Sequence, residues 1–512
     1  MITRLDNVKL NITDSESKLL DIARKNLKAD VKYFKILKKS LDARDKNNIR
    51  WVYSVEFSAH GAEEPRPQLE KLKTPPKVAV IGSGPAGLFC AVRLIEHGFA
   101  PVIIERGEPV EARAKTTQSF FCGGALNTNS NVQFGEGGAG TFSDGKLNTQ
   151  THDGLNRDVL KIFQRFGAPE EILYLNKPHI GSDKLFSVLQ NIRKFITDNG
   201  GGYLFNTIFC GFTKKDGKIA SVLLKNAVNG KESEMSADCV VAALGHSSRD
   251  TFEMLAQNGI AMEPRDFAVG VRIEHLAESI SLAQYGKNFR LLPTADYKLV
   301  SHAHERTVFT FCMCPGGVVI PAASEEGGVV VNGMSLYARN GKNSNSALMV
   351  QMKKQDFGGG LFDGMNFQRE IERRAYAYGG KNYKAPVQLY GDFANDRISS
   401  TFGEVEPTYA AGTEFAPLSE VLPQIATDAL KAAIPDMDKR LKGFASPYAV
   451  LTGVETRFSS PVKILRGESG ESITLNGFYP CGEGGGYSGG ITSSAADGLA
   501  TAEKIFKKFK NH

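Results

Sequence analysis

The first sixty residues alternate between apolar and polar side chains in a way that predicts a small α+β module. Residues 2–10 alternate with the two-residue period of a strand, and an apolar face with helical spacing then runs to Leu27. Residues 34–41 and 51–57 are typical of two further strands. The order strand, helix, strand, strand therefore predicts a separate unit over residues 1–60.

A charged linker separates this module from the rest of the chain at residues 61–76, and it carries Pro65, Pro67, Pro75 and Pro76. A continuous apolar run at 77–81 then predicts a buried strand. The amphipathic segment 86–97 predicts a helix, and 101–105 predicts a second strand. Strand, helix and strand in this order indicate a parallel sheet covered by helices.

The remaining chain alternates between helical and β-rich stretches. The predicted elements are helices at 158–166 and 182–198, a β-rich run at 203–243 with hairpin turns at Asp216-Gly217 and Asn229-Gly230, a second β-rich run at 267–350, a strand at 477–481 and a helix at 492–508. Neither an internal repeat nor a low-complexity segment interrupts them, so the chain is expected to be globular throughout.

Composition narrows the class of protein. A chain of 512 residues is long enough for two or three domains. Its seven cysteines are odd in number and follow no disulfide framework, and the first ten residues carry charges instead of the apolar core of a signal peptide. No uninterrupted apolar stretch reaches the roughly 18 residues of a membrane span. We therefore expect a reduced, cytoplasmic protein without a membrane segment.

The first glycine cluster directly follows the strand at 77–81. Residues 82–87 read Gly-Ser-Gly-Pro-Ala-Gly, the G-x-G-x-x-G pattern between a strand and a helix that binds dinucleotides. The first glycine permits the tight turn, the second lets the backbone approach a pyrophosphate, and the third lets the helix pack on the sheet. The residues predicted to contact the cofactor here are Gly82, Gly84, Pro85, Ala86 and Gly87.

The strand at 101–105 ends in Glu105, 18 residues beyond Gly87, where a carboxylate is expected to accept hydrogen bonds from an adenosine ribose. Arg106 follows directly. An arginine in this place can accommodate the 2′-phosphate of NADP, but a Glu-Arg pair is also common in FAD enzymes. The pair therefore does not decide which dinucleotide is bound.

The last glycine cluster decides for FAD. Residues 477–491 form a strand that ends in Gly482-Glu483 and a glycine-rich loop that leads into the final helix. This resembles the second FAD motif of two-domain flavoproteins, in which the carboxylate contacts the ribityl chain. Glu483 takes that place here. Backbone N–H groups near Gly490 and Ile491 are expected to hold the flavin carbonyl oxygen.

A third cluster, residues 238–247, reads as a buried strand that ends in Gly245 and returns the chain to the cofactor domain. His246 follows it. Two interpretations stay open for this histidine: a residue on the flavin or substrate side, or a loop histidine whose hydrogen bonds are satisfied within the protein.

The run Phe134-Gly-Glu-Gly-Gly-Ala-Gly-Thr-Phe-Ser-Asp-Gly-Lys146-Leu, together with segments 245–250, 312–317, 453–457 and 481–490, resembles the bacterial family of uncharacterised FAD-dependent (NAD/FAD-utilising) dehydrogenases. The resemblance covers nearly the whole chain. It implies a glutathione-reductase-type FAD domain with an inserted substrate domain, and it names no substrate. The loop at 134–147 is expected to line the flavin pocket through Gly138, Gly140, Gly145 and Lys146.

The predicted fold class is α/β. A Rossmann-type FAD domain, with a parallel sheet and a β-meander, occupies 77–266 and 451–512. An α+β substrate domain is inserted at 267–450, and the βαββ module and linker precede both. Lys146 is interpreted either as a positive charge near reduced flavin or a substrate anion, or as a solvated loop lysine.

Few other residues suggest chemistry, and the catalytic residues stay unidentified. Cys312 and Cys314 would point to the same face of a strand, where they are either a redox pair or packing residues. Cys122 and Cys481 lie near the glycine clusters and fit small spaces. His302 and His304 lack further ligands at recognisable spacing, so no metal site is predicted.

These observations predict an FAD-dependent oxidoreductase that acts on a small molecule. No second nucleotide fingerprint is evident, so either NAD(P)H binds transiently without one or an organic substrate reduces the flavin. The first 60 residues carry 13 Lys/Arg against 8 Asp/Glu, so an RNA-associated flavoprotein is kept as an alternative, although nucleic acid is not the favoured partner. A flavin-binding protein without turnover is the third possibility, and the oligomeric state is left open.

Overall fold

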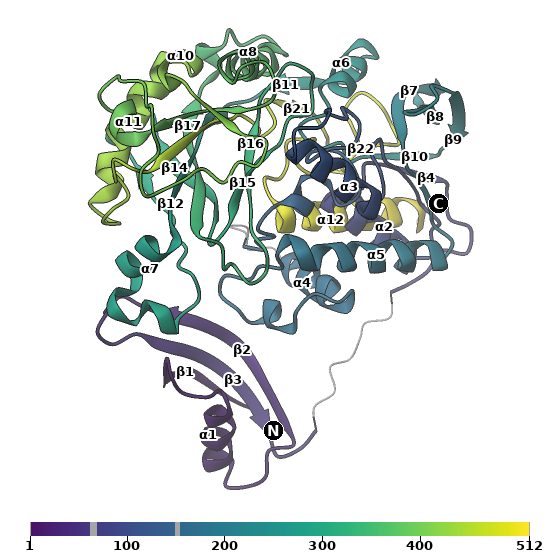
Figure 1. Cartoon of the computed structure of the whole chain (residues 1–512). Coiled ribbons are helices and arrows are strands. Elements are labelled where there is room, and N and C mark those ends of the chain that lie inside the picture. The colour runs from purple at the N-terminus through teal and green to yellow at the C-terminus, as the bar shows by residue number, and fades with distance from the viewer. Residues whose placement is uncertain (1, 62–68, 149–153, 511–512) are drawn as a thin grey trace.

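The computed structural model describes residues 2–61, 69–148 and 154–510. The chain forms an N-terminal module, a domain built on a parallel sheet, and an inserted domain built on a large mixed sheet (Figure 1). Pro65 and Pro67 of the predicted linker lie outside the described residues. The α/β fold class with a βαββ module, a parallel sheet, a β-meander and an inserted α+β domain is confirmed.

The N-terminal module is a three-stranded antiparallel sheet with one helix packed on one face. Its strands lie in the order β1-β3-β2, and its core centres on Leu19, Val55 and Phe57. The elements are β1 (Thr3–Asn11), α1 (Ser17–Leu27), β2 (Tyr33–Asp42) and β3 (Arg50–Ser58). The period-two alternation of the strands and the helical period up to Leu27 therefore predicted every element of this module.

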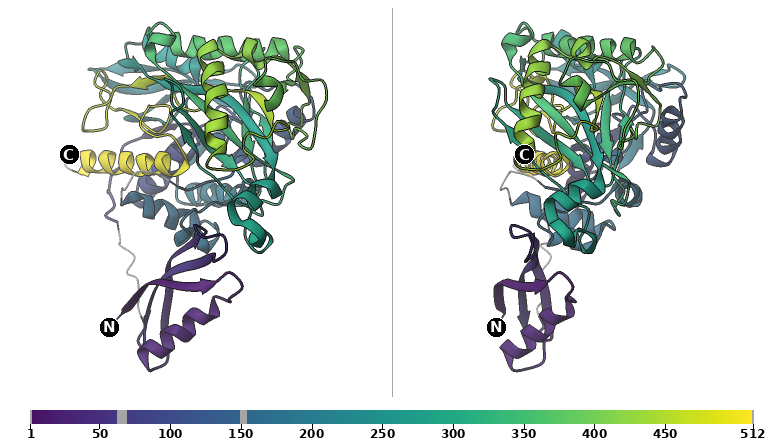
Figure 2. Two further views of the ribbon diagram at one scale, coloured as in Figure 1. Left: turned by 90° about the vertical axis from the view of Figure 1, so that its left-hand side faces the viewer. Right: turned by 60° about the vertical axis from the view of Figure 1, so that its left-hand side comes forward.

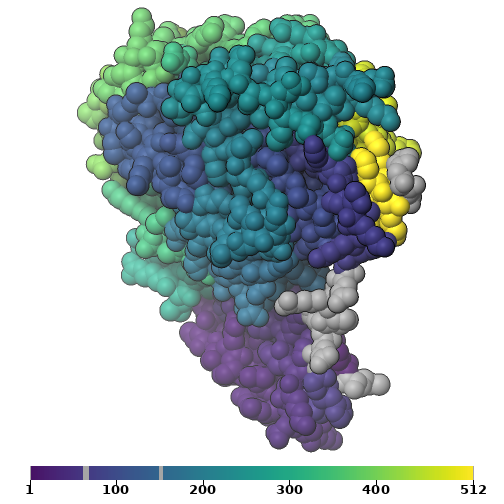
Figure 3. Space-filling view, turned by 90° about the vertical axis from the view of Figure 1, so that its right-hand side faces the viewer, coloured from purple at the N-terminus to yellow at the C-terminus, as the bar shows by residue number. Residues whose placement is uncertain are grey.

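Contacts at Lys39 and Lys46 join the module to the body of the protein. The backbone of Lys39 on β2 exchanges hydrogen bonds with Tyr174 and Asn176, and the ammonium of Lys46 donates to the carbonyl of Ala283 in the inserted domain. Two of the module's basic residues are thus engaged within the protein. The module still stands out as a separate lobe beneath the body (Figures 2 and 3).

Five parallel strands form the sheet of the second domain, in the order β22-β10-β4-β5-β6. They are β4 (Val78–Ile81), β5 (Val102–Ile104), β6 (Gly202–Leu204), β10 (Cys239–Ala242) and β22 (Phe478–Pro480). The strand from the start of the domain and the strand from the end of the chain therefore both pair with β10. Because parallel strands end at the same edge, the first and last glycine clusters meet there.

Helices cover one face of this sheet and a β-meander covers the other. On the helical face α2 and α12 lie side by side (Figure 1), and their apolar side chains share one core with those of α4 and α5. The helices are α2 (Pro85–Glu96), α3 (Val110–Phe121), α4 (Leu155–Arg165), α5 (Ser182–Asp198) and α12 (Ile491–Lys510). The meander is β7 (Thr207–Lys215), β8 (Lys218–Asn226) and β9 (Glu232–Ser236), followed after β10 by α6 (Arg249–Gln257).

The inserted domain is a seven-stranded sheet in the order β13-β14-β17-β12-β20-β18-β19. Its strands are β12 (Phe267–Leu276), β13 (Val300–Ser301), β14 (Val308–Cys314), β17 (Asn343–Met352), β18 (Ala385–Leu389), β19 (Thr413–Phe415) and β20 (Val450–Glu455). Two ribbons accompany it, β15 (Val318–Pro321) with β16 (Val331–Met334) and β11 (Met262–Pro264) with β21 (Val462–Ile464).

Helices surround this sheet, and a second large core lies beneath α8 and α11. They are α7 (Ala277–Tyr285), α8 (Asp363–Tyr378), α9 (Tyr390–Phe393), α10 (Leu418–Val421) and α11 (Gln424–Asp438). Short 3-10 turns complete the fold at η1 (Gly138–Phe142), η2 (Glu170–Leu173), η3 (Gly286–Leu291) and η4 (Lys354–Asp356). Among the described helices, none has both the length and the apolar character needed to span a bilayer.

Candidate functional site

The first glycine cluster makes a tight turn from β4 into α2. Gly82 adopts a φ of +97°, which favours glycine, and a Cβ on Gly87 would overlap the carbonyl oxygen of Gly82. Pro85 and buried Ala86 form the first turn of α2. A Cβ on Gly84, by contrast, would meet nothing nearer than the Cα of Gly138 at 3.9 Å. Gly84 therefore exposes its backbone at a helix N-terminus, which suits an anion.

Glu105 is buried at the end of β5, and protein donors already saturate its carboxylate. One oxygen accepts from the backbone and hydroxyl of Ser83, at 2.9 and 2.6 Å. The other accepts from the backbone of Gly107 at 2.9 Å and of Gly135 at 3.0 Å. A carboxylate has about four acceptor positions, so a ribose hydroxyl has to displace the Ser83 hydroxyl. Ribose binding by Glu105 stays a prediction.

Arg106 turns away from Glu105 toward α6. Its guanidinium donates to both carboxylate oxygens of Asp250 at 2.9 Å and to Thr251 at 3.1 Å. The same group lies over the ring of Phe134, 4.4 Å from its centre. Three neighbours from two segments, α6 and the loop at 134, thus fix a planar cation beside the dinucleotide motif.

Hydrogen bonds from Arg113 on α3 hold the loop at 134–147 in place. The sequence pattern did not reveal this role of Arg113. Arg113 is fully buried and donates to several carbonyl groups, among them those of Asn131 at 2.9 Å and Gly138 at 2.9 Å. Burial lowers the pKa of Arg113 to about 10. A buried arginine that donates mainly to carbonyl groups serves to fix the shape of the loop around it.

This loop brings the two glycine motifs together. A Cβ on Gly138 would lie 3.0 Å from the Cα of Gly84, and a Cβ on Gly140 would lie 3.1 Å from the side chain of Ile491. The loop therefore passes the first turn of α2 and then the first turn of α12. Gly145 lies farther on, where a Cβ would meet the backbone of Gly181.

The second motif packs against both other glycine clusters. A Cβ on Gly482 would lie 2.6 Å from the Cβ of Ala86, and one on Gly484 would lie 2.6 Å from the carbonyl oxygen of Gly245. Gly490 is exposed at the start of α12. Asp497 on α12, which sequence reasoning missed, accepts the backbone N–H of Gly482 at 2.8 Å. It anchors the loop on the helix that follows.

Glu483 is paired with His246. The histidine Nδ1 lies 3.0 Å from a carboxylate oxygen of Glu483, while its Nε2 is buried and has no hydrogen-bond partner in the described structure. The two residues follow neighbouring strands, β10 and β22. His246 therefore belongs to the cofactor edge of the sheet and orients the carboxylate predicted to contact the ribityl chain.

Lys146 links the loop to the inserted domain. Its ammonium pairs with Asp144 at 3.0 Å and donates to the carbonyl of Met313 on β14. Burial opposes ionisation of Asp144, but Lys146 and Arg339 outweigh it and hold the pKa of this carboxyl at about 2. The next residue is held at the start of α12, because Thr492 donates to the carbonyl of Leu147 at 2.8 Å. Lys146 is thus half-buried and ordered, not a solvated loop lysine.

The prediction that Cys312 and Cys314 share one face is wrong. A register irregularity interrupts β14 between Phe311 and Cys314, and Cys312 adopts a φ of +39°. A bulge of this kind breaks the alternation of side chains along a strand. As a result Cys312 is exposed and Cys314 is buried, and both thiols are free.

Cys312 is accessible from the surface. The surrounding protein nevertheless removes water from around its thiolate, and this desolvation raises the pKa of the thiol to about 12. Its carbonyl oxygen accepts from Arg272 at 2.8 Å, which holds the bulge in place. We expect iodoacetamide at pH 7.5 to modify Cys312 at least about a hundredfold more slowly than an ordinary thiol, because the thiolate is the reactive form. Timed labelling with mass spectrometry checks this against exposed Cys122. Equal rates would contradict it.

The other candidate residues of the sequence have partners within the protein. Cys481 is buried and accepts a hydrogen bond from Thr501. His302 contacts Thr307, and His304 accepts a backbone N–H from Arg306. Among the residues that the structure describes, His, Cys, Asp and Glu form no group of three or more that could hold a metal ion.

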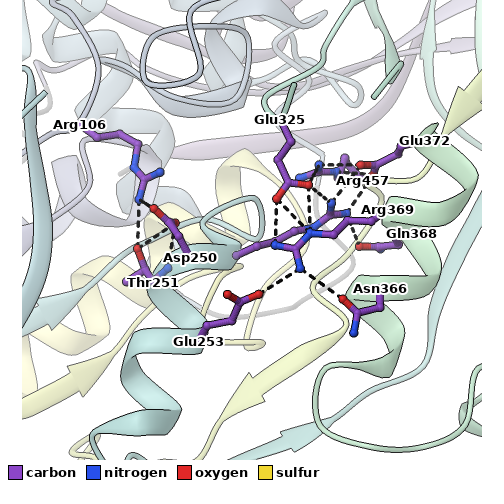
Figure 4. A network of polar contacts seen from close by, with 11 residues as sticks. Arg106, Asp250, Thr251, Glu253, Glu325, Asn366, Gln368, Arg369, Glu372 and Arg457 are labelled. Carbon is purple, nitrogen blue, oxygen red and sulfur yellow. Dashed lines mark hydrogen bonds and ion pairs between the residues drawn. The ribbon is translucent and has the colours of Figure 1, made fainter. Parts of the chain in front are cut away.

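A buried ion-pair network connects the cofactor edge to the inserted domain (Figure 4). Arg249, at the start of α6, donates to Glu372 on α8 at 2.9 Å, and Arg457 beyond β20 donates to the same carboxylate at 2.8 Å. Glu325 and Arg369 extend the network toward the surface. Sequence reasoning missed it because its members are distant in the chain, with Arg249 and Glu372 lying 123 residues apart, and because they carry no local pattern.

The residues present fit FAD. Two helix N-termini, α2 and α12, converge on one glycine loop, and the close approach of Gly138 to Gly84 leaves backbone in place of side chains there. N-termini stabilise phosphate and developing negative charge. Glu483 follows Gly482, which packs against Ala86 in the first turn of α2, so phosphate-binding and hydroxyl-binding groups occur at the same edge.

Family models match three parts of the chain. An FAD binding domain matches residues 77–180, and the C-terminal domain of an FAD-dependent protein matches residues 266–458. A domain of unknown function matches residues 1–58. An uncharacterised protein of Clostridium beijerinckii is 45% identical over 537 aligned positions, which cover 99% of each chain.

Solved structures resemble the chain only distantly. A geranylgeranyl bacteriochlorophyll reductase-like protein of Thermoplasma acidophilum is 12% identical with a TM-score of 0.38, covering 85% of this chain and 79% of its own. The glycerol-3-phosphate dehydrogenase of Bacillus halodurans, solved with FAD, is 10% identical with a TM-score of 0.38, covering 86% and 66%.

Proposed function

Because the chain belongs to the family of FAD-dependent proteins that includes the Clostridium beijerinckii protein, with FAD as its cofactor, we propose that it is an oxidoreductase that transfers a hydride between FAD and a small organic substrate. The observation that carries the proposal is the path of the loop at 138–147. The loop contacts the N-termini of α2 and α12 and then reaches β14 of the inserted domain through Lys146.

Gly84, Pro85 and Gly138 would hold the pyrophosphate of FAD, and Glu483, oriented by His246, would hold its ribityl chain. Gly490 and Ile491, at the N-terminus of α12, would face the flavin carbonyl oxygen. Bound FAD supplies an acceptor for a hydride or an electron pair. The substrate would enter beside Cys312, where the edge-to-face rings of Phe311 and Phe458, 4.5 Å apart, provide an apolar wall.

Lys146 would stabilise negative charge that builds on the cofactor during reduction, because its ammonium is fixed next to the residue held by α12. We expect Lys146→Met to lower the two-electron reduction potential of the bound flavin by about 30 mV, the shift that corresponds to 1.4 kcal/mol. Photoreduction with a reference dye measures it. The control is Lys184→Met, which removes an ammonium that lies over the ring of Tyr337. A reduction potential that is unchanged in both variants would contradict the proposed role of Lys146.

The electron donor is proposed to be NADH or NADPH, bound without a second nucleotide fingerprint. The visible spectrum of the purified protein, recorded before and after each is added without oxygen, tests this. Bleaching of the flavin bands by one of them identifies the donor. Bands that persist with both would exclude NAD(P)H as the donor and leave direct oxidation of the organic substrate. A protein that takes up no flavin after reconstitution would overturn the whole proposal.

A further inference from the structure

The bulge in β14 sets the thiol of Cys312 apart from the regular strand. The pairing of β14 with β17 is interrupted between Phe311 and Cys314, and Cys312 takes a φ of +39°, a backbone conformation that side chains rarely adopt. Fully buried Arg272 holds this conformation, because it donates to the carbonyl of Cys312 at 2.8 Å and pairs with Glu455. Strained backbone that the surrounding structure keeps in place is typical of functional sites.

A second cation, Lys146, approaches the same bulge from the cofactor loop. Its ammonium donates to the carbonyl of Met313, the residue that follows Cys312. Desolvation raises the pKa of the Cys312 thiol to about 12, while the charges of Arg272 and Lys146 act in the opposite direction. At neutral pH the thiol is therefore protonated, and a thiolate formed there would be stabilised by two cations. Such a group is able to give a proton but not to take one.

An apolar wall adjoins this thiol on the same strand. Phe309 and Phe311 of β14 pack edge-on against Phe458, with their ring centres 5.3 and 4.5 Å from the centre of the Phe458 ring. All three rings are only partly buried, and Cys312 beside them is exposed. Buried Met349 of β17 packs with the rings. The accessible surface next to the thiol is therefore aromatic, which favours a substrate with an aromatic or branched hydrocarbon body.

Two consecutive residues connect this wall to the cofactor edge. Lys146 contacts β14 at Met313. Leu147, the next residue, accepts a hydrogen bond at 2.8 Å from Thr492 in the first turn of α12. The proposed function places the flavin at this helix N-terminus. The bulge of β14 is therefore the part of the inserted domain that the cofactor loop brings next to the flavin.

We propose that the thiol of Cys312 donates the proton in the reduction of an activated carbon–carbon double bond, an inference that rests on the proposed function. The substrate is an apolar α,β-unsaturated carbonyl compound. Its β carbon takes the hydride, the π bond breaks, and its α carbon takes the proton of the S–H group. The two electrons of the hydride come from reduced FAD. The thiolate of Cys312, stabilised by Arg272 and Lys146, then regains a proton from water.

The protonated state of the thiol selects this class of substrate. After hydride transfer the α carbon carries the negative charge of an enolate and is strongly basic, so even a weak acid protonates it. Oxidation of an alcohol or an amine would instead require a base that removes a proton, and a protonated thiol is not one. Cys312 therefore favours reduction of the substrate over its oxidation.

Stopped-flow oxidation of the photoreduced, FAD-loaded protein by two alkenes, without oxygen, tests the proposal. α-Methyl-trans-cinnamaldehyde needs a proton at its α carbon to complete the reaction, whereas trans-β-nitrostyrene forms a nitronate that is stable in water without one. We expect Cys312→Ala to slow flavin reoxidation by the aldehyde at least about a hundredfold, the usual contribution of a general acid, and to leave the reaction with nitrostyrene nearly unchanged. The matched control is Cys210→Ala, which removes an exposed thiol on β7 and should behave like the parent protein with both alkenes.

Loss of the aldehyde reaction alone in Cys312→Ala assigns the proton to this thiol. Equal slowing of both reactions means that the thiol only shapes the wall, and parental rates with both alkenes mean that the proton comes from elsewhere. Either result overturns the proposal, as does a reduced parent protein that the aldehyde fails to oxidise. Flavin absorbance and its bleaching by NADH or NADPH are read beforehand, so a protein that binds and reduces FAD but does not react with the aldehyde refutes this inference and leaves the proposed oxidoreductase intact.

Discussion

A Gly84→Val protein is expected to fold normally and to bind no FAD. The structure has room for the new side chain, since the nearest atom to a Cβ at this position is the Cα of Gly138 at 3.9 Å. That room lies at the N-terminus of α2, where the backbone must approach a pyrophosphate closely. The valine would therefore fill the place of the phosphate without straining the empty protein.

The measurement compares flavin absorbance and thermal unfolding. We expect FAD affinity to fall at least about a hundredfold, since the pyrophosphate contacts of a whole helix N-terminus are lost. The variant should unfold at the temperature of the FAD-free parent protein, because only the stabilisation by bound ligand disappears. A Gly84→Val protein that stays yellow after gel filtration would remove Gly84 from the cofactor site.

Gly87→Ala provides the contrast. A Cβ there would overlap the carbonyl oxygen of Gly82, so the helix has to shift away from the sheet. Overpacking of this kind costs about 1–3 kcal/mol. We expect the FAD-free Gly87→Ala protein to unfold at a lower temperature than the FAD-free parent, whereas Gly84→Val should not. Equal stability of both variants would contradict this division of roles within one motif.

The sequence predicted those parts of the site that depend on local spacing. The turn at Gly82, the helix at Pro85 and the second cluster before Ile491 follow from short motifs with fixed offsets. Their meeting could also be anticipated, because both motifs follow strands of one parallel sheet. The same reasoning gave the seventeen-residue helix Ser182–Asp198 with its correct ends, since its apolar period is long and regular.

What escaped prediction depends on irregular backbone or on distant partners. The bulge that separates Cys312 from Cys314 leaves no mark in a period-two pattern. The carboxylate of Glu105 was expected to be free to accept hydrogen bonds from a ribose. In the structure it already accepts hydrogen bonds from Ser83 and from the backbone N–H groups of Gly107 and Gly135. The hydrogen-bond inventory of a carboxylate becomes visible only when the fold brings those donors together.

The ion pair between Arg249 and Glu372 shows the second limit most clearly. Each residue sits near the beginning or the middle of an ordinary amphipathic helix, where a charged side chain is normally a solvated one. Both are buried, with Arg249 only 1% exposed. Such charges are tolerated because each neutralises the other across the domain boundary. The pattern of a single helix therefore misassigns them to the surface.

Glu372→Ala should be the most destabilising single change in this network. It leaves Arg249 and Arg457 buried without their shared carboxylate. Breaking a buried ion pair by removing one partner costs about 3–5 kcal/mol. The midpoint of urea unfolding, measured with excess FAD, should fall accordingly. Glu370→Ala, which removes an exposed glutamate of the same helix, should leave the midpoint nearly unchanged.

The pH dependence of stability tests the electrostatic origin of this effect. Burial opposes ionisation of Glu372, but Arg249 and Arg457 outweigh it and lower the pKa to about 2. A depressed pKa in the folded state stabilises the fold at every pH above the unfolded value of about 4.3, and this contribution is lost as pH falls toward 2. Glu372→Gln should therefore be less stable than the parent at pH 7 by about 3 kcal/mol, and the difference should shrink between pH 4.5 and 2.5. A difference that stays constant over this range would mean that lost packing, not lost charge, destabilises the variant.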